Sequence, residues 1–386
     1  MTKIWKCAII IVYVDHKIRT EDTVMKLSVC FTRILSFFRN ISSNNIPAGS
    51  LEYVLSDDTS YYSVAGIGRC KSTSVTVPSD YNGKPVKAIL DNAFYECSKI
   101  TDVTISSNVE TVGDSAFEGC TNLTSVTFPS TLTSVGKNAF RNCRHLLLAD
   151  LPNSVHTLGK AVFAGCESMT TATLSNKLTV IPENAFCGCS NLRNMYFPYA
   201  VTAIEESAFR NCIRLKSVNF NGVENIGSFA FSNCSCLEAV EPPYNIQSVG
   251  HSAFMGCESL HTVILPPALL SVTKNMFKGC KSLKSIMLPY NVMTIECGAF
   301  EGCEGLNNLT VENGVISIGY NSFSGCRHLK AVTYLGTKFE WQLIKIKHSN
   351  PIKRIFSGNM TAKNYSLFPS CRYIHCTDGM YQPNGQ

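Results

Sequence analysis

The sequence predicts a solenoid, in which one short unit repeats and neighbouring units stack side by side. Three observations lead to this prediction. A cysteine recurs about every 23 residues, a phenylalanine stands three residues before each of these cysteines, and apolar residues recur at fixed distances after them. A fixed period of about 20 to 50 residues is typical of solenoids, propellers and arrays. This repeat overrides the roughly two or three domains that the length alone would suggest.

The Phe and Cys columns define the repeat. Every gap between successive cysteines is 23 residues, except for the 22 between Cys212 and Cys234. The cysteines are Cys97, Cys120, Cys143, Cys166, Cys189, Cys212, Cys234, Cys257, Cys280, Cys303 and Cys326. The phenylalanines are Phe94, Phe117, Phe140, Phe163, Phe186, Phe209, Phe231, Phe254, Phe277, Phe300 and Phe323. We number the repeats 1 to 11 by these cysteines and count positions from the cysteine, so that plus 6 of repeat 2 is Val126.

Each repeat contains a short strand after its cysteine. In repeat 2 the apolar residues Val126 and Phe128 stand two apart, which is the period of a strand that buries one face. Pro129 follows and removes a backbone donor, so we expect the strand to end there. Leu132 and Val135 then turn the chain back over the core. One repeat is too small to bury its own apolar side chains, so neighbours must stack in register.

The segment before each cysteine is expected to form one helical turn, as in residues 114–117. The position just before the cysteine is Gly or Asn in every repeat but the first, where it is Glu96, and these residues tolerate the left-handed conformation that ends a helix. A second glycine, seven before the cysteine, is replaced by Pro182 in repeat 5, so this position cannot require a positive φ. The missing residue before Cys234 falls in the turn of residues 220–227, which leaves the core register intact.

The repeat resembles the BspA-like leucine-rich repeats, whose unit runs roughly C-x-x-L-x-x-V-x-I-P-x-x-V-x-x-I-G-x-x-A-F-x-G. The resemblance covers about residues 61–376, with residues 62–89 similar to the family's first unit and residues 334–341 and 373–379 similar to its closing segment. It implies a leucine-rich-repeat solenoid of the α/β horseshoe type, rich in β-structure. Its parallel β-sheet would line the concave face and short helical turns the convex face.

The expected organisation has four parts: an N-terminal extension (1–50), an N-terminal cap with a first repeat (51–90), an array of about eleven units (91–336), and a C-terminal cap and tail (337–386). Residues 4–14 are as long as the apolar part of an export signal, but Lys6 interrupts them and no cleavage site follows. An imperfect signal, an extra segment upstream of Met25, and an amphipathic stretch over residues 27–38 stay open.

Charge argues against a nucleic-acid partner. The net charge is +6, but residues 51–337 carry 20 basic and 23 acidic residues, so the repeat array is mildly acidic. No apolar run is long enough to span a membrane. The resemblance implies exported proteins used in adhesion and in host or matrix binding. We therefore predict a non-enzymatic protein-binding module, at the cell surface or secreted, with an intracellular scaffold as the alternative.

The cysteines of the column are expected to be buried small apolar residues rather than metal ligands or disulfides. Cys187 with Cys189 and Cys234 with Cys236 lack a second pair and nearby His ligands, so no metal site is predicted. Cys371 and Cys376 could pair in an oxidising compartment. The histidines occupy variable repeat positions without recurrent partners, and the Gly-Lys pairs lack phosphate-loop spacing. No catalytic residue and no cofactor is predicted.

The candidate binding surface is the outer face of the strands. If plus 6 and plus 8 point inward, plus 5 and plus 7 point outward, and these positions are mostly small and polar. From repeat 5 onward the neighbouring plus 4 position carries long charged side chains. Aromatic residues and arginine concentrate binding energy at interfaces. The predicted protein-binding residues are Arg193, Tyr196, Asn219, Glu241 and His261.

Overall fold

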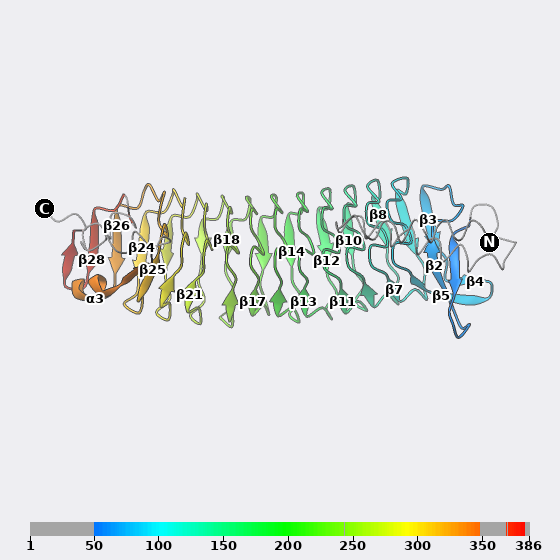
Figure 1. Cartoon of the computed structure of the whole chain (residues 1–386), viewed down its shortest axis with the longest axis horizontal. Coiled ribbons are helices and arrows are strands. Elements are labelled where there is room, and N and C mark those ends of the chain that lie inside the picture. The colour runs from blue at the N-terminus through cyan, green and yellow to red at the C-terminus, as the bar shows by residue number, and fades with distance from the viewer. Residues whose placement is uncertain (1–49, 243, 348–367, 369, 383–386) are drawn as a thin grey trace, which may run out of the picture.

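The computed structural model describes residues 50–242, 244–347, 368 and 370–382. Figure 1 shows an elongated stack of coils that follow one another in a nearly straight row, from β2 (Tyr62–Gly66) near one end to β28 (Tyr373–Cys376) at the other. Each repeat forms one coil, and we keep the repeat numbers for the coils. Apart from residue 50, the predicted N-terminal extension lies outside the described residues, and so do residues 348–367 of the predicted C-terminal tail.

Two ladders of short strands run along the stack, the first divided into five sheets and the second into three; their strands pair in parallel except for one antiparallel pair at each end. The first ladder, formed by the strands that follow the cysteines, comprises β3 (Ser74–Val77), β6 (Asp102–Ile105), β8 (Ser125–Thr127), β10 (Leu148–Asp150), β12 (Thr171–Thr173), β14 (Asn194–Tyr196), β16 (Ser217–Asn219), β18 (Ala239–Val240), β20 (Thr262–Val263), β22 (Ser285–Met287), β24 (Asn308–Val311), β26 (Ala331–Tyr334), β28 (Tyr373–Cys376) and β29 (Gly379–Tyr381). The second ladder comprises β1 (Glu52–Leu55), β2 (Tyr62–Gly66), β5 (Lys84–Ile89), β7 (Thr111–Val112), β9 (Ser134–Val135), β11 (Thr157–Leu158), β13 (Val180–Ile181), β15 (Ala203–Ile204), β17 (Asn225–Ile226), β19 (Ser248–Val249), β21 (Ser271–Val272), β23 (Thr294–Ile295), β25 (Ser317–Gly319) and β27 (Lys345–Lys347). A further strand, β4 (Asp80–Tyr81), pairs with β5.

The register of the ladders follows the repeat. Asn194 of β14 pairs with Ser217 of β16, one full repeat away. In the second ladder Ala203 of β15 pairs with Asn225 of β17, only 22 residues away, and Asn225 then pairs with Ser248 of β19. The missing residue therefore lies in the turn between β16 and β17, as the sequence predicts. The second ladder continues past it, and in the first ladder β16 and β18 belong to separate sheets but keep the same inward-facing position, Val218 and Val240.

The phenylalanine column runs through the core as a stack of rings. From Phe94 to Phe323 the centroids of neighbouring rings lie 4.8 to 5.8 Å apart with the ring planes near parallel. Phe368 extends the stack at the C-terminal end, 4.7 Å from Phe323. All rings of the column are buried. This confirms that successive coils share one interior.

The cysteine column is buried as predicted, from Cys120 to Cys326, while Cys97 at the N-terminal end is half-buried. The structure adds a hydrogen bond that the sequence does not reveal. Each buried thiol donates to the carbonyl oxygen of the phenylalanine in the preceding coil, as Cys212 Sγ does to Phe186 O at 3.2 Å. The column therefore links coils by polar contacts as well as by packing.

The prediction of helical turns on the convex face is wrong. The segment before each cysteine is a run of turns, and the position five before the cysteine has a positive φ in every coil, for example 52° at Ser115 and 53° at Ala161. A left-handed residue there prevents a helix from continuing. The position just before the cysteine is also left-handed, as predicted, and this includes Glu96 of the first repeat.

Coil spacing gives the physical reason for this difference. Strands in a ladder lie about 4.8 Å apart, whereas a helix with its side chains is about 10–12 Å wide. In a straight stack a helix in every coil would collide with its neighbours. The backbone N–H groups of this segment instead bind either to the next coil or within their own turn. Phe117 N donates to Ala139 O of the next coil, and Cys120 N donates to Phe117 O within the turn. This third side of the coil therefore stacks like the two ladders.

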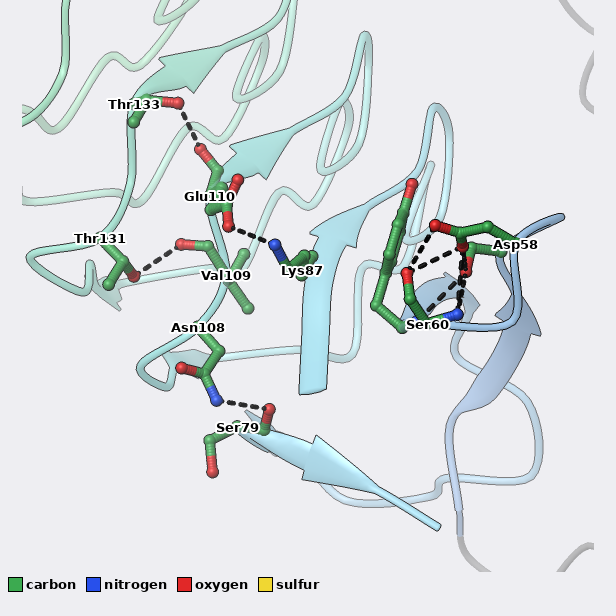
Figure 2. A network of polar contacts seen from close by, with 11 residues as sticks. Asp58, Ser60, Ser79, Lys87, Asn108, Val109, Glu110, Thr131 and Thr133 are labelled. Atoms are coloured by element: carbon green, nitrogen blue, oxygen red, sulfur yellow. Dashed lines mark hydrogen bonds and ion pairs between the residues drawn. The ribbon is translucent and has the colours of Figure 1, made fainter. Parts of the chain in front are cut away.

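Polar side chains tie successive coils together at their edges. Figure 2 shows this near the N-terminal end, where Asn108 donates to Ser79 O and Thr133 donates to Glu110 O. The Glu110 carboxylate also pairs with Lys87 of the preceding coil at 3.0 Å. Because both groups of this ion pair are substantially exposed, it contributes little to stability.

Each end of the stack has its own closing structure. At the N-terminal end β1 pairs antiparallel with β2, and the ring of Tyr53 stacks on Tyr81. At the C-terminal end the helix α3 (Lys338–Leu343) buries Trp341 against Tyr334. A capping box at Thr337 starts this helix, which is the only helix among the residues described. The described N-terminal closure and α3 limit the exposure of apolar core that an open stack would otherwise have.

Candidate protein-binding face

The outer surface of the first ladder is the candidate binding surface, and we call it the first-ladder face. It corresponds to the surface that the sequence predicts as concave. In coil 2 Val126 points into the core while Ser125 and Thr127 are exposed, and the same alternation recurs along the ladder. The face is continuous because neighbouring coils stand side by side (Figure 1). Each coil thus contributes a few outward side chains to one long surface.

In the N-terminal coils the polar groups of this face bind one another. Asp102 accepts hydrogen bonds from Thr101, Thr124 and Ser125, and these hydroxyl groups lower the pKa of its carboxyl, Ser125 most of all. The remaining outward residues of these coils are mostly threonine and serine. The large apolar side chains exposed on this half of the face are Leu147 and Leu148 of coil 3.

From coil 5 onward the first-ladder face carries longer and charged side chains, and the predicted binding residues begin there. Arg193, Glu238 and His261 lie in one exposed column at plus 4, held in register by backbone hydrogen bonds: Lys216 N to Arg193 O, Glu238 N to Lys216 O, and His261 N to Glu238 O. Tyr196 ends β14 and is 69% exposed. The structure therefore places long charged groups on the first-ladder face beside an aromatic ring.

The side chains of the five predicted residues differ in how far they are exposed to a partner. Arg193, Tyr196, Glu241 and His261 are exposed. Asn219 is half-buried, and its side-chain amide accepts a hydrogen bond from Phe197 N at 2.6 Å. Its amide group is thus engaged with the neighbouring coil. The structure brings Tyr196 and Asn219 side by side in paired strands and places Glu241 in the next coil of the same column.

Other exposed apolar residues, on this face and in the turns that follow its strands, were not singled out from the sequence. Ile264 and Met287 occupy plus 7 in coils 8 and 9, and both are exposed. Tyr199, Tyr244 and Tyr290 occupy plus 10 in coils 5, 7 and 9. A recurrent Pro-Tyr pair in these three repeats is the signal that could have located them. Together with Tyr196, they concentrate large apolar side chains in coils 5 to 9.

A second exposed apolar group lies on the other ladder. Leu270, Met293 and Ile316 stand just before β21, β23 and β25, so they form a row across three successive coils. Backbone hydrogen bonds from Met293 N to Leu270 O and from Ile316 N to Met293 O keep the row in register. The row contains no aromatic residue and is separated from the first-ladder face by the turn between the ladders. It provides matched control positions for experiments on that face.

The buried thiols are poorly suited to chemistry. Burial raises the pKa of the Cys257 thiol to about 12 and that of Cys326 to about 12, so both stay protonated at neutral pH. Cys371 and Cys376 are free thiols in the structure. Within the described part of the chain, no cluster of three or more His, Cys, Asp or Glu side chains could hold a metal ion. The same residues include no helix with the length and apolarity to cross a membrane.

Stacked coils with two parallel ladders and a shared Phe, Leu and Cys interior define a leucine-rich-repeat solenoid. The family model of the BspA type leucine rich repeat region matches six copies over residues 87–216 and 202–330, and the chain belongs to this family. Leucine-rich-repeat proteins generally act as non-enzymatic scaffolds that bind proteins. No curated protein matches the chain.

Two solved structures share the fold, and a third is similar in sequence. The pneumococcal vaccine antigen PcpA is 18% identical with a TM-score of 0.52, and the match covers 81% of this chain and 97% of that one. A leucine-rich repeat protein from Bacteroides ovatus is 24% identical with a TM-score of 0.50, covering 80% and 100%. A leucine rich cell surface protein from Faecalibacterium prausnitzii is 25% identical with a TM-score of 0.48, covering 79% and 98%.

Proposed function

We propose that the protein is a surface or secreted adhesion module that binds a host or matrix protein through the first-ladder face of coils 5 to 9. One observation carries the proposal: the exposed Tyr196, Ile264 and Met287 and a column of long charged side chains lie on this face in coils 5 to 9, whereas coils 1 to 4 carry mainly small polar groups beside Leu147 and Leu148. Aromatic residues and arginine supply most of the binding energy at protein interfaces. The surface or secreted location rests on membership of the BspA-type family.

The test measures binding of the full chain to purified extracellular-matrix and host-surface proteins by surface plasmon resonance. The double variant Arg193→Ala with Tyr196→Ala should weaken binding at least about tenfold, because both exposed side chains would be removed from the interface. The matched control is Met293→Ala, an exposed apolar residue of the other ladder. Equal affinity of the double variant and the wild type would contradict the proposal.

An intracellular scaffold is the alternative, and it uses the same face. Cell fractionation with N-terminal sequencing of the mature chain separates the two. A processed N-terminus or a surface location supports the adhesion module. An unprocessed chain found only inside the cell supports the scaffold.

A further inference from the structure

A charged column borders the first-ladder face from coil 5 to coil 9. Its plus 4 residues are all exposed and lie one per coil: Arg193, Lys216, Glu238, His261 and Lys284. We propose that the face of these coils binds an amphipathic α-helix of a partner protein, which lies along the solenoid axis with an acidic stripe against this column. This inference rests on the proposed protein-binding function and names the conformation and the charge of the partner's binding segment.

Three columns of outward side chains give this part of the face a shape that suits a helix. Between the plus 4 and plus 7 columns, the plus 5 residues are short: Asn194, Ser217, Ala239, Thr262 and Ser285. At plus 7 the exposed large apolar residues are Tyr196, Ile264 and Met287. Strand residues rise about 3.3 Å each, so plus 4 and plus 7 lie about 10 Å apart, close to the roughly 10–12 Å width of a helix with its side chains. A helix can therefore rest on the short residues, with charged groups along one side and apolar groups along the other.

The spacing between coils is close to the pitch of a helix. Paired strands lie about 4.8 Å apart. The stacked core rings of coils 5 to 9 lie 5.3 to 5.8 Å apart. One turn of an α-helix rises about 5.4 Å, so each coil meets one turn. At the strand spacing, the mismatch between coil 5 and coil 9 grows to about 2.4 Å, which is less than half a turn and within the reach of long arginine and lysine side chains.

Two other peptide conformations do not match this spacing. In an extended strand, residues on one face repeat about every 6.6 Å. In a polyproline II helix, one edge repeats about every 9.3 Å. Neither conformation presents one side chain to each coil, so the spacing favours the α-helix.

The order of charges along the column separates a helix from a uniform polyanion. Three cations form no ion pair with another described residue: Arg193, Lys216 and Lys284. In coil 8, His261 can donate a hydrogen bond to a carboxylate. Coil 7 interrupts the column with two exposed carboxylates, Glu238 at plus 4 and Glu241 at plus 7. A nucleic acid or a sulfated polysaccharide would place negative charge opposite these carboxylates, whereas a helix can carry acidic residues over coils 5, 6, 8 and 9 and a basic residue over coil 7.

The test uses the full chain and a fluorescent peptide of about five helical turns. Its acidic stripe carries glutamate in every turn except the third, which carries lysine, and leucines form the neighbouring stripe. This charge order is the same from either end, so the third turn faces coil 7 in both orientations of the peptide. Fluorescence anisotropy should show that this peptide binds at least about tenfold more tightly than a second peptide with glutamate in the third turn.

Charge exchange on the protein provides the matched variants. Glu238→Lys should weaken binding of the first peptide and strengthen binding of the second. The control Glu206→Lys reverses an exposed charge in the turns before Cys212, outside this face, and should leave both affinities unchanged. Ile264→Ser with Met287→Ser should weaken both peptides at least about fivefold, because their apolar contacts are lost. Circular dichroism checks that each variant is folded.

Four results overturn the inference: no detectable binding of the first peptide, equal binding of the two peptides to the wild type, an unchanged preference in Glu238→Lys, or binding of heparin as tight as that of the first peptide. Failure here is distinct from failure of the proposed function. If the Arg193 and Tyr196 double variant loses a matrix protein while the first peptide does not bind, the protein-binding face is supported and only the helical ligand is wrong. If the first peptide binds but no host or matrix protein does, the helix site is supported and the adhesion role is wrong.

Discussion

Replacing Phe209 by alanine measures how much the ring stack contributes to stability. Phe209 is fully buried, and its ring lies 5.3 Å from both Phe186 and Phe231 and 5.6 Å from Phe197. A buried Phe→Ala change costs about 3–5 kcal/mol, and each aromatic contact contributes about 0.5–1.5 kcal/mol beyond burial. With both stacked neighbours lost, we expect Phe209→Ala to lower the free energy of unfolding by about 5 kcal/mol.

Phe94 provides the internal comparison. It is equally buried in the same column, but at the end of the stack it has one stacked neighbour among the described residues, Phe117 at 4.8 Å. Phe94→Ala should therefore cost about 1 kcal/mol less than Phe209→Ala. Urea denaturation followed by circular dichroism measures both, and Phe209→Leu, which keeps most of the volume, should cost only about 1–2 kcal/mol. An equal or larger loss for Phe94→Ala would refute the stacking argument.

Three further predictions concern the cysteine column and the turns. Cys212→Ala removes the hydrogen bond to Phe186 O and leaves a small cavity, so it should destabilise by about 1–2 kcal/mol in urea denaturation. In Cys212→Ser, which keeps a donor to Phe186 O, the backbone amides next to Phe186 should exchange hydrogen slowly, as in the wild type, whereas in Cys212→Ala they should exchange faster. Equal exchange rates in the two variants would contradict a role for the donor. Burial raises the pKa of Cys257 from 9.0 to about 12, so its stabilising effect is complete below pH 9 and is lost between pH 9 and 12. Between pH 9 and 12 this thiol should lower the free energy of unfolding by roughly 1 kcal/mol per pH unit. The decrease should be less steep in Cys257→Ala. A free energy of unfolding that stays constant over this pH range would exclude the effect. Gly188→Ala should cost about 1 kcal/mol from the strain of φ +76° alone, since the added carbon meets only ordinary contacts, whereas Gly188→Asn should cost less; thermal melting compares the two.

The repeat made the core readable from the sequence, because a column of identical residues must share one environment. The Phe and Cys columns, the strand after each cysteine, and the shortened turn in residues 220–227 all follow from the period of 23 residues. The thiol hydrogen bonds could not be read in this way. They depend on how the Cys212 Sγ of one coil meets the Phe186 O of the previous one, which only the stacked geometry fixes.

The helical turn was the main error in the predicted fold. Residues 114–117 have a composition that suits a helical turn, but local preference is decided here by the spacing between coils. Asn or Gly holds the left-handed position five before the cysteine in six of the eleven coils, but residues such as Ser115, Ala161 and Phe229 hold it in the others, so its sequence signal is only partial. Gly or Asn marks the position before the cysteine in ten of the eleven repeats, which is why that left-handed position was recognised and the other was not.

The candidate binding face was only partly accessible to sequence reasoning. Counting from the cysteine located its outward columns, because strand alternation is regular, and so led to Arg193 and Tyr196. It could not show that the amide of Asn219 binds the backbone of Phe197. It also stopped at the end of the strand, which left the tyrosines one turn further on, such as Tyr244, outside the predicted set.

The direction of the bonds between coils has a mechanical consequence. Contacts such as Phe117 N to Ala139 O join one coil to the next, so they run along the length of the rod. A force pulling the two ends apart would open one interface at a time rather than shear many at once. Each released coil would exchange a rise of about 4.8 Å for an extended length of roughly 75 Å. Under tension the solenoid would therefore lengthen by unfolding one coil at a time, and the outer faces of the remaining coils would stay intact.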